Sequence, residues 1–362
     1  MIHLQGTDTN LPQYFSILQF PARRHWFLGS KDTGKVEPLR QLMPADVQVE
    51  VREVRPFDAA STRQVMSDII SSLPRSKRIG VHVTGGTKMM FAGALSACNE
   101  YTNTEPFYFD VKNHNITFLN TNKTVAFVGV RAIEGIIRAC GYKITEPGCW
   151  QDNPNREKRR ELTMRIAEKY SIFSGLFKNK DFRNYVVKPG KEPEPFNFSV
   201  SKLMVSYKKG YVTMSLDGEE FQYSDSMDFP FYLGGGWLEE YAYMLFQPLL
   251  ESGDIVDLRI GVKAESAIRN HSSEMPLIEL DGVFTDGKRL YVIECKSGEV
   301  TQNHIQKLAN NVMQLGGQAA RGILVHSCDL IEAHKERIRT MRNLRSLSLS
   351  HCSRDELRQL LS

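Results

Sequence analysis

The chain has 362 residues, of which 41% are hydrophobic and 24% charged, and it carries a formal net charge of +4. This is an ordinary globular composition with room for two or three domains, and the charge is too small to indicate nucleic-acid binding by itself. Six scattered cysteines without zinc-type spacing favour a reducing cytoplasm. The sequence shows neither a signal-peptide core nor an apolar run of about 20 residues, so we expect a cytoplasmic protein without a membrane segment.

The first 130 residues or so alternate between strand and helix patterns. This alternation predicts a mostly parallel, doubly wound sheet, which binds ligands beyond the carboxyl ends of its strands at the switch point. The predicted strands are 1–4, 25–29, 47–54, 79–84 and 106–111, and the predicted helices are 11–20, 36–43, 61–73 and 87–101.

Three turns that follow these strands are candidate ligand contacts: 6–10, 29–33 and Thr84-Gly85-Gly86-Thr87-Lys88. In the third, glycines allow close backbone approach, and free N–H groups at a helix start suit a phosphate. The alternative is a tight turn with Thr87 as a helix N-cap. We favour phosphate binding, and the candidate ligand-binding residues are Thr7, Asn10, Ser30, Lys31, Thr84, Gly85, Gly86, Thr87 and Lys88.

Residues 29–36 have the spacing of a phosphate-binding loop, but Val36 replaces the Ser or Thr that would hold magnesium. No later strand ends in a convincing magnesium-binding Asp. We therefore interpret this match as coincidence.

The middle of the chain, residues 131–226, is less regular. Helical spacing covers 132–142, a charged helix runs from Asn155 to about Tyr170, and residues 188–195 form a turn-rich break. Residues 198–223 alternate in polarity and contain two hairpin-like turns. We predict a linker with a small β element.

A further domain is expected from Phe229 onward. Residues 237–247 have a helical apolar stripe that we expect to end before Pro248, and Glu239 and Glu240 are its candidate acids. One of the two is expected to be a solvated glutamate. Residues 253–262 are the expected first strand, and 265–273 a polar loop.

Residues 277–296 are the most informative stretch, because two β-prone apolar runs flank Asp286-Gly287, a strong signal for a two-residue hairpin loop. With that loop, Asp281 stands opposite Val292 and lies diagonally from Glu294, at roughly 7–8 Å. Side chains alternate between faces, so one face carries Glu279, Asp281, Glu294 and Lys296. The opposite face, interpreted as core, carries Leu280, Phe284, Tyr291, Ile293 and Cys295.

An Asp on one strand and Glu-x-Lys on the next is a set suited to metal-dependent phosphodiester cleavage. The carboxylates can hold a hard divalent ion, which neutralises phosphate charge and lowers the pKa of a bound water. The ammonium can orient that water and stabilise the transition state. The simpler alternative is a solvated hairpin face with salt bridges.

Asp281, Glu294-Cys295-Lys296 and Gly235-Gly-Trp-Leu-Glu239 resemble the PD-(D/E)xK nuclease superfamily, although Leu280 replaces the usual proline. The glycine spacing favours Glu239 as the upstream acid. Thr84–Lys88 resembles the CARF domains of CRISPR defence proteins, which are Rossmann-like dimers that bind cyclic oligoadenylate. The whole chain is thus similar to CARF-fused nucleases activated by cyclic tetra-adenylate.

This resemblance implies a Rossmann-like CARF domain at 1–135, a linker and small β element at 136–226, and a restriction-endonuclease-like (PD-(D/E)xK) domain at 227–362. It implies Mg²⁺ or Mn²⁺ as cofactor and cyclic tetra-adenylate as activator. It also implies a homodimer that cleaves RNA and/or DNA in type III CRISPR antiviral defence. Asp281, Glu294 and Glu279 are the expected metal ligands, with Glu239 and Lys296 as further catalytic residues.

In the last part of the chain, the residue pattern predicts a helix at 301–315, a strand at 322–326 and a helix at 329–341. The basic stretch 335–345 suits backbone phosphates or a solvated helix face equally well. Arg345 and His351 resemble the pair of HEPN ribonucleases, but the alternating residues between them predict a strand, and we reject that reading. Two rivals stay open: a ligand-sensing regulator with an inactive nuclease fold, and a restriction- or repair-type DNA nuclease.

Overall fold

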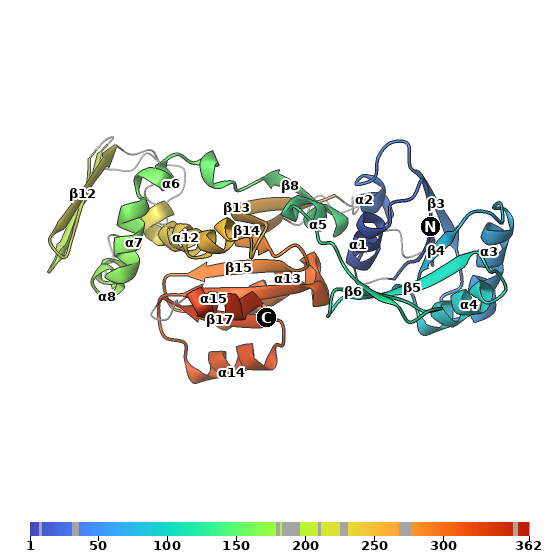
Figure 1. Cartoon of the computed structure of the whole chain (residues 1–362). Helices are drawn as coiled ribbons and strands as arrows, with labels where there is room; N and C mark the ends of the chain where they lie inside the picture. The colour runs from blue at the N-terminus through green and yellow to red at the C-terminus, as the bar shows by residue number, and fades with distance from the viewer. Residues whose placement is uncertain are drawn as a thin grey trace.

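The computed structural model describes residues 1–6, 9–30, 36–178, 182, 196–208, 211–224, 231–267, 277–349 and 354–361. These residues form three sheets, of seven, six and four strands. In Figure 1 the seven-stranded sheet lies at one end of the molecule, the six-stranded sheet in the middle and the four-stranded sheet at the other end. The mixed α/β class expected from the sequence is confirmed.

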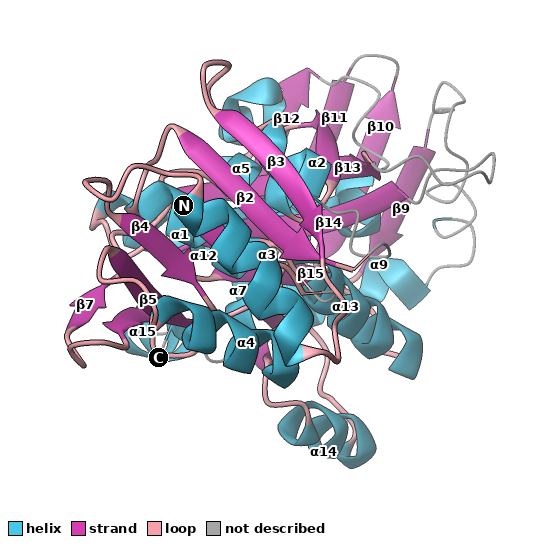
Figure 2. Cartoon of the chain, turned by 90° about the vertical axis from the view of Figure 1, so that its right-hand side faces the viewer, coloured by secondary structure: helices cyan, strands magenta, loops and turns pink. Residues whose placement is uncertain are grey.

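The N-terminal sheet has the strand order β3-β2-β1-β4-β5-β6-β7. The first five of these strands run parallel, and β6 and β7 add an antiparallel edge that the sequence did not predict. Figure 2 shows β2 and β3 side by side in this sheet. Its strands are β1 (Ile2–Leu4), β2 (Arg24–Gly29), β3 (Gln48–Glu53), β4 (Ile79–His82), β5 (Thr104–Asp110), β6 (Asn115–Phe118) and β7 (Thr124–Ala126).

Helices cover both faces of this sheet, as expected for a doubly wound fold. Buried residues of α1, α2 and α5 pack on one face, and those of α3 and α4 pack on the other. The helices are α1 (Leu11–Gln19), α2 (Val36–Arg40), α3 (Ala59–Ser71), α4 (Lys88–Cys98) and α5 (Ile133–Ala139).

The C-terminal sheet has the order β17-β16-β15-β14-β13-β8. Strands β15, β16 and β17 run parallel, whereas β8, β13, β14 and β15 pair antiparallel. Edge strand β8 comes from the segment predicted to be a linker. The strands are β8 (Tyr142–Glu146), β13 (Asp257–Ser266), β14 (Leu277–Thr285), β15 (Leu290–Lys296), β16 (Ala320–His326) and β17 (Leu344–Ser348).

Helix α12 (Trp237–Glu251) does not end before Pro248, so that prediction was wrong. Pro248 lacks an N–H and cannot donate to the carbonyl of the preceding turn. Phe246 and Leu249 are both fully buried on either side of it, and this packing sustains the helix across the lost hydrogen bond.

Three further helices and two short helical turns complete the described part of the C-terminal domain. Helix α13 (Gln302–Leu315) buries its apolar residues on the sheet face that carries Val292 and Leu324. The remaining elements are the turns η2 (Tyr232–Gly236) and η3 (Gly317–Ala319) and the helices α14 (Glu332–Thr340) and α15 (Arg354–Leu361).

The middle segment is built from short helices and the four-stranded sheet, ordered β12-β11-β10-β9. Its buried residues belong to the same cluster as those of α12 and the C-terminal sheet, so it packs against that domain. Its elements are η1 (Trp150–Asp152), α6 (Asn155–Lys158), α7 (Arg160–Glu168), α8 (Tyr170–Phe173), α9 (Gly175–Lys178), β9 (Phe196–Val200), β10 (Leu203–Lys208), β11 (Tyr211–Leu216) and β12 (Glu219–Ser224).

One buried cluster joins the two larger sheets. It includes Phe15 of α1 and Ile137 of α5 together with Leu280, Leu308 and Leu324 of the C-terminal domain. The two domains therefore share a continuous apolar core. Among the described residues, no helix combines the length and apolarity that crossing a bilayer requires.

Three histidines are buried in the N-terminal sheet on neighbouring strands. His3 Nε2 lies 2.9 Å from His25 Nδ1, and His3 Nδ1 lies 3.4 Å from His82 Nδ1. Burial lowers the pKa of His25 to about 4 and that of His82 to about 3, and it lowers the pKa of His3 well below its usual value. The folded protein therefore keeps all three rings neutral in weak acid, whereas the unfolded chain protonates them.

We expect this trio to make the fold acid-sensitive. Since the lowered pKa values belong to the folded state, stability is complete above about pH 6.5 and falls below it, by about 1.4 kcal/mol per pH unit for each neutral histidine. Urea unfolding at pH 7, 6 and 5 measures this slope. His82→Leu, which removes one buried ring, should reduce the slope by about one proton; an unchanged slope would contradict the assignment.

Candidate active site and ligand cleft

The β14–β15 hairpin has a different loop from the one predicted. Thr285 stands opposite Leu290, so residues 286–289 form a four-residue connection. The Asp286 carboxylate accepts from the backbone N–H groups of Lys288 and Arg289, both at 2.7 Å, and holds this wider loop closed. The prediction of a two-residue loop at Asp286-Gly287 was therefore wrong.

The corrected register differs by two residues from the predicted one. An even shift keeps every side chain on its own face, so the shared face survives the error. The ladder ends where Gly282 stands opposite Ile293, and its register, extended by one residue, would set Asp281 opposite Glu294 rather than diagonal to it. Both carboxylates therefore stay on the face that we predicted.

Asp281, Glu294 and Lys296 form a compact ionic group. The Cys295 backbone N–H donates to Asp281 Oδ2 at 2.7 Å. Lys296 Nζ lies 2.8 Å from Glu294 Oε1 and 3.6 Å from Asp281 Oδ2. The Glu294 side chain is 1% exposed and that of Asp281 12%, so this is a largely buried group and not a solvated hairpin face.

The sequence analysis missed a second lysine in this group. Lys307 of α13 places its Nζ 2.9 Å from Glu294 Oε2 and 4.0 Å from Asp281 Oδ1. Residues 301–315 predict an amphipathic helix, and a helix between parallel strands must return over the sheet. That signal did not reveal which face α13 would cover, and so Lys307 was not singled out.

Burial and repulsion by neighbouring carboxylates shift the pKa values of Asp281 and Glu239 upward. Burial raises the pKa of Asp281, and the Glu294 carboxylate raises it further. Burial, with the charge of Asp281, raises the pKa of Glu239 well above its usual value. Burial alone would lower the pKa of Lys296, but the Asp281 and Glu294 charges outweigh it and raise that pKa. The site thus concentrates negative charge where water is scarce.

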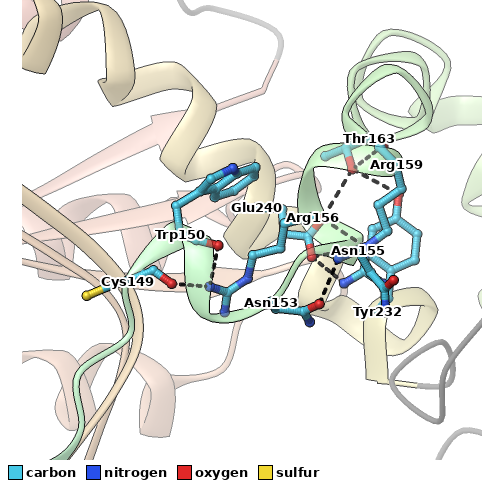
Figure 3. A network of polar contacts seen from close by, with 9 residues as sticks. All are labelled: Cys149, Trp150, Asn153, Asn155, Arg156, Arg159, Thr163, Tyr232 and Glu240. Atoms are coloured by element: carbon cyan, nitrogen blue, oxygen red, sulfur yellow. Dashed lines mark hydrogen bonds and ion pairs between the residues drawn. The ribbon is translucent and has the colours of Figure 1, made fainter.

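Glu240 is not the solvated glutamate that we expected one of the pair to be. Arg159 Nε donates to both carboxylate oxygens of Glu240 at 3.1 Å, and its Nη2 donates to Oε1 (Figure 3). Thr163 Oγ1 lies 3.4 Å from Glu240 Oε2 and 3.0 Å from the Tyr232 hydroxyl. The Arg159 guanidinium lies 4.3 Å from the Tyr232 ring centroid. This buried network ties the middle segment to α12.

Glu239 therefore points elsewhere, because consecutive helix residues are turned by roughly 100°. Its pKa responds to Asp281, Lys296 and Glu279, which places it on the side of the ionic group. Glu279 itself is exposed on β14, opposite Lys263 of β13. The buried ion pair of Glu240 thus distinguishes the two candidate acids.

The donor set fits a magnesium-type ion with few protein ligands. Among the residues that the structure describes, no group of three or more His, Cys, Asp or Glu side chains is arranged to hold a metal, so Glu279 does not complete a set with Asp281 and Glu294. Mg²⁺ usually binds one or two carboxylates and takes its other ligands from water and phosphate. Burial first, and then the charge of Glu294, raises the pKa of Asp281, and a divalent cation would relieve the repulsion between the two carboxylates.

Tyr170 of α8 reaches the same region from the middle segment. Its hydroxyl donates to the backbone carbonyl of Ser297, the residue that follows Lys296. It also lies 3.6 Å from Cys328 Sγ, just beyond β16. The segment predicted as a linker therefore holds the loops at the ends of β15 and β16.

A cleft of about 730 Å³ lies beyond the carboxyl ends of β1, β2 and β4. This is the switch point of the N-terminal sheet, where the sequence predicted ligand binding. A Cβ on Gly85 would overlap the Leu4 carbonyl oxygen, and Gly86 has a φ of +78°, so both glycines are required by the backbone. Thr87 caps α4 by accepting from the Met90 N–H at 3.2 Å.

The predicted ligand residues divide into three groups. Asn10 is buried, and its amide donates to the Ala139 carbonyl at 3.0 Å while its oxygen accepts from Gln5. Lys88 is exposed and does not line the cleft, and Thr7 and Lys31 lie outside the described residues. The residues that do line the cleft are Ser30, Thr84, Gly85, Gly86 and Thr87.

The cleft also has walls that we did not predict. From the N-terminal domain they include Gln5, Thr9, Gln13, Tyr108, Asp110 and Lys112. From the C-terminal domain they include Met313 and residues 316–319. Gly316-Gly317 signals a helix end in the sequence, but the meeting of the two domains could not be deduced from it.

The basic stretch on α14 has partly neutralised charges. Lys335, Arg339 and Arg345 line a second cavity of about 760 Å³. Glu332 lies 3.5 Å from Lys335 Nζ and 3.2 Å from Arg339 Nη1, and Glu336 also contacts Arg339. These ion pairs favour the solvated helix face over a phosphate-binding stretch.

The fold and the ionic group define the class of protein: a two-part α/β protein with a Rossmann-like N-terminal domain and a C-terminal mixed sheet that carries the ionic group. Residues 229–355 match the family model of the Card1-like endonuclease domain. This part of the chain is therefore similar to Card1-like endonuclease domains. Among curated protein sequences there is no match to the chain.

Solved structures share the whole architecture. Can2 from Sulfobacillus thermosulfidooxidans, in complex with cyclic tetra-adenylate, matches with a TM-score of 0.73 and 19% identity over 99% of this chain and 97% of its own. Protein VC1899 from Vibrio cholerae matches with a TM-score of 0.76 and 16% identity, over 99% and 95%. A type III CRISPR defence DNA nuclease activated by cyclic oligoadenylate matches with a TM-score of 0.61 and 15% identity. The chain spans about half of that nuclease, 51%.

The Arg159–Glu240 pair should be costly to break from one side. Arg159→Met leaves a buried carboxylate without its partner, and we expect a loss of about 3–5 kcal/mol in the free energy of unfolding. Urea denaturation measures it. The double variant Arg159→Met/Glu240→Leu should recover most of this loss, and a single variant within about 1 kcal/mol of wild type would contradict the role given to the pair.

Proposed function

We propose that the chain is a metal-dependent nuclease, activated by cyclic tetra-adenylate, that cleaves phosphodiester bonds of RNA or DNA in type III CRISPR antiviral defence. The observation that carries the proposal is the buried Asp281–Glu294–Lys296 group inside the region that is similar to Card1-like endonuclease domains. The whole-chain likeness to Can2 with cyclic tetra-adenylate, and to a cyclic oligoadenylate-activated DNA nuclease, supports the same activity.

In this proposal Asp281 and Glu294 hold Mg²⁺ or Mn²⁺, which supplies phosphate neutralisation and an activated water. Glu239 approaches from the first turn of α12 and takes part through its charge at the same face. Glu279 stands at the exposed margin, where it would act as an outer ligand through water. These roles make use of carboxylates that the hairpin already brings together.

Lys296 is held for a role at the reacting phosphate. Its ammonium is oriented by contacts with Glu294 and Asp281, and their charges keep it protonated at neutral pH. A fixed ammonium can position the attacking water and stabilise the negative charge that develops on the phosphorus oxygens. The intact set of three charged groups argues against the rival of an inactive nuclease fold.

The activator is proposed to bind the cleft beyond β1, β2 and β4. Its glycine backbone and the N-terminus of α4 suit a phosphate, and Ser30, Thr84 and Thr87 line the cleft beside them. Lys88 stands exposed in the first turn of α4 and would reach the ligand from the margin. A homodimer would place two copies of this cleft around one cyclic, internally symmetric ligand.

A cleavage panel of RNA and DNA substrates against cyclic oligoadenylates of several ring sizes tests the proposal as a whole. We expect cleavage only with divalent metal and with the tetra-adenylate ring. Cleavage without any cyclic oligonucleotide would favour the restriction- or repair-type rival, and no cleavage under any combination would favour the inactive regulator.

Asp281→Ala and Glu294→Ala should each abolish cleavage and still bind the activator, because the residues that line the cleft are not among the carboxylates. Cleavage assays in Mg²⁺ and Mn²⁺ measure the first effect, and calorimetric titration with cyclic tetra-adenylate measures the second. Full cleavage by both variants would remove the pair from the mechanism.

Lys296→Ala should lower the single-turnover cleavage rate far more than it weakens substrate binding. Losing one such contact costs about 2.7–4 kcal/mol of transition-state stabilisation, roughly a hundred- to thousand-fold in rate. Arginine should rescue poorly, since its planar fork does not reproduce a compact ammonium. A rate within a few-fold of wild type, at saturating activator and metal, would sink this assignment.

A further inference from the structure

Helix α13 reaches both of the sites described above. Its middle carries Lys307 against the carboxylate pair, and its C-terminal end, with η3, forms part of the cleft wall. From Lys307 to Gly316 the helix rises by roughly 13 Å, at about 1.5 Å per residue. One rigid element thus connects the ligand cleft with the nuclease site.

At the nuclease end, Lys307 and Lys296 bind the same carboxylate, and Lys307 also lies 3.3 Å from Oε1, the oxygen that Lys296 contacts. Lys307 Nζ is 2.9 Å from Glu294 Oε2, and Lys296 Nζ is 2.8 Å from Glu294 Oε1. The Lys307 side chain is 42% exposed, against 24% for Lys296. Lys307 is therefore the lysine on the more open side of the carboxylates, from which a polynucleotide can approach.

At the cleft end, α13 makes hydrogen bonds and packing contacts with residues from the N-terminal half of the chain. Cys140 Sγ donates to the Leu315 carbonyl at 3.1 Å, and the Tyr142 hydroxyl donates to Gln314 Oε1 at 3.3 Å. The side chain of Leu11, at the start of α1, packs close to Gly316. A ligand that reshapes the cleft must push against these contacts.

The helix is suited to transmit such a shift as a unit. Ile305, Leu308, Val312 and Leu315 form a fully buried stripe along its length. Close-packed side chains move together rather than deform one by one. A displacement at Gly316 is therefore carried along the helix to Lys307.

We propose that Lys307 is a substrate-binding residue of the nuclease site, which contacts a backbone phosphate of the nucleic acid, and that α13 makes this contact depend on occupancy of the cleft. Without ligand in the cleft, Glu294 engages the Lys307 ammonium. With ligand, the shifted helix releases Lys307 from Glu294 and presents it to the phosphate. This inference rests on the proposed function and adds to it the residue that couples activation to substrate binding.

The test uses the full chain in EDTA, where metal-dependent cleavage is blocked and binding alone is read. Fluorescence anisotropy of labelled single-stranded RNA and DNA oligonucleotides gives affinity with and without cyclic tetra-adenylate, over a series of salt concentrations. The variants are Lys307→Ala and Lys307→Arg, with Gln306→Ala as a control on the exposed neighbouring position. Thermal unfolding checks that each variant folds.

For wild type and Gln306→Ala, the activator should raise oligonucleotide affinity about ten-fold or more, the size of one charge-assisted contact. Lys307→Ala should lose this gain, and its salt slope with activator should be shallower by about 0.7, the loss of one phosphate contact on a single strand. Lys307→Arg, which keeps the charge, should retain most of the gain. A purely structural role of Lys307 would not change the salt slope.

An equal activator-dependent gain in Lys307→Ala and wild type would overturn the inference, as would an unchanged salt slope. Wild-type cleavage on addition of activator and Mg²⁺ separates this result from failure of the proposed function. If wild type is activated but Lys307 contributes nothing to binding, the inference alone fails. If wild type neither binds the cyclic ligand nor cleaves, both fail.

Discussion

Two carboxylates held opposite each other in a largely buried place repel, and this repulsion determines what the surrounding chain must provide. The backbone N–H of Cys295 and two lysines offset it for Asp281 and Glu294. Burial by itself disfavours the ionised form of Asp281, so the positive charge of each lysine helps to keep the carboxylates ionised. A site with this balance is poised to exchange an ammonium for a metal ion or a substrate group.

The middle segment holds the elements that carry this site through two polar contacts. Arg159 neutralises Glu240 in the first turn of α12 (Figure 3). Glu239 is left as the acid of that turn whose pKa is raised by burial and by the charge of Asp281. Tyr170 fixes the carbonyl next to Lys296. Buried ion pairs add little net stability, because desolvation opposes the attraction, but their geometry is specific. The network is therefore better understood as orienting α12 than as strengthening the fold.

The sequence predicted what depends on periodicity and missed what depends on long-range packing. Strand alternation placed Asp281, Glu294 and Lys296 on one face, and this survived a wrong loop because the register error was even. Lys307 was missed because no local pattern tells which sheet face α13 covers. The burial of Asn10 was not foreseen because its partner, the Ala139 carbonyl, is remote in sequence. The helix was predicted to end before Pro248, but the buried neighbours of that proline keep the helix continuous to Glu251.

The shared core gives the two domains a mechanical relation that separate cores would not. Phe15 and Ile137 belong to the same buried cluster as Leu308 of α13. A displacement of the helices that cover the N-terminal sheet would therefore change the packing of α13. A ligand shifts an equilibrium only through unequal affinity for the two states, and a cleft with walls from both domains offers that inequality directly. Since the same helix ends at the cleft and carries Lys307, the proposed coupling between ligand binding and the carboxylates needs only this one element.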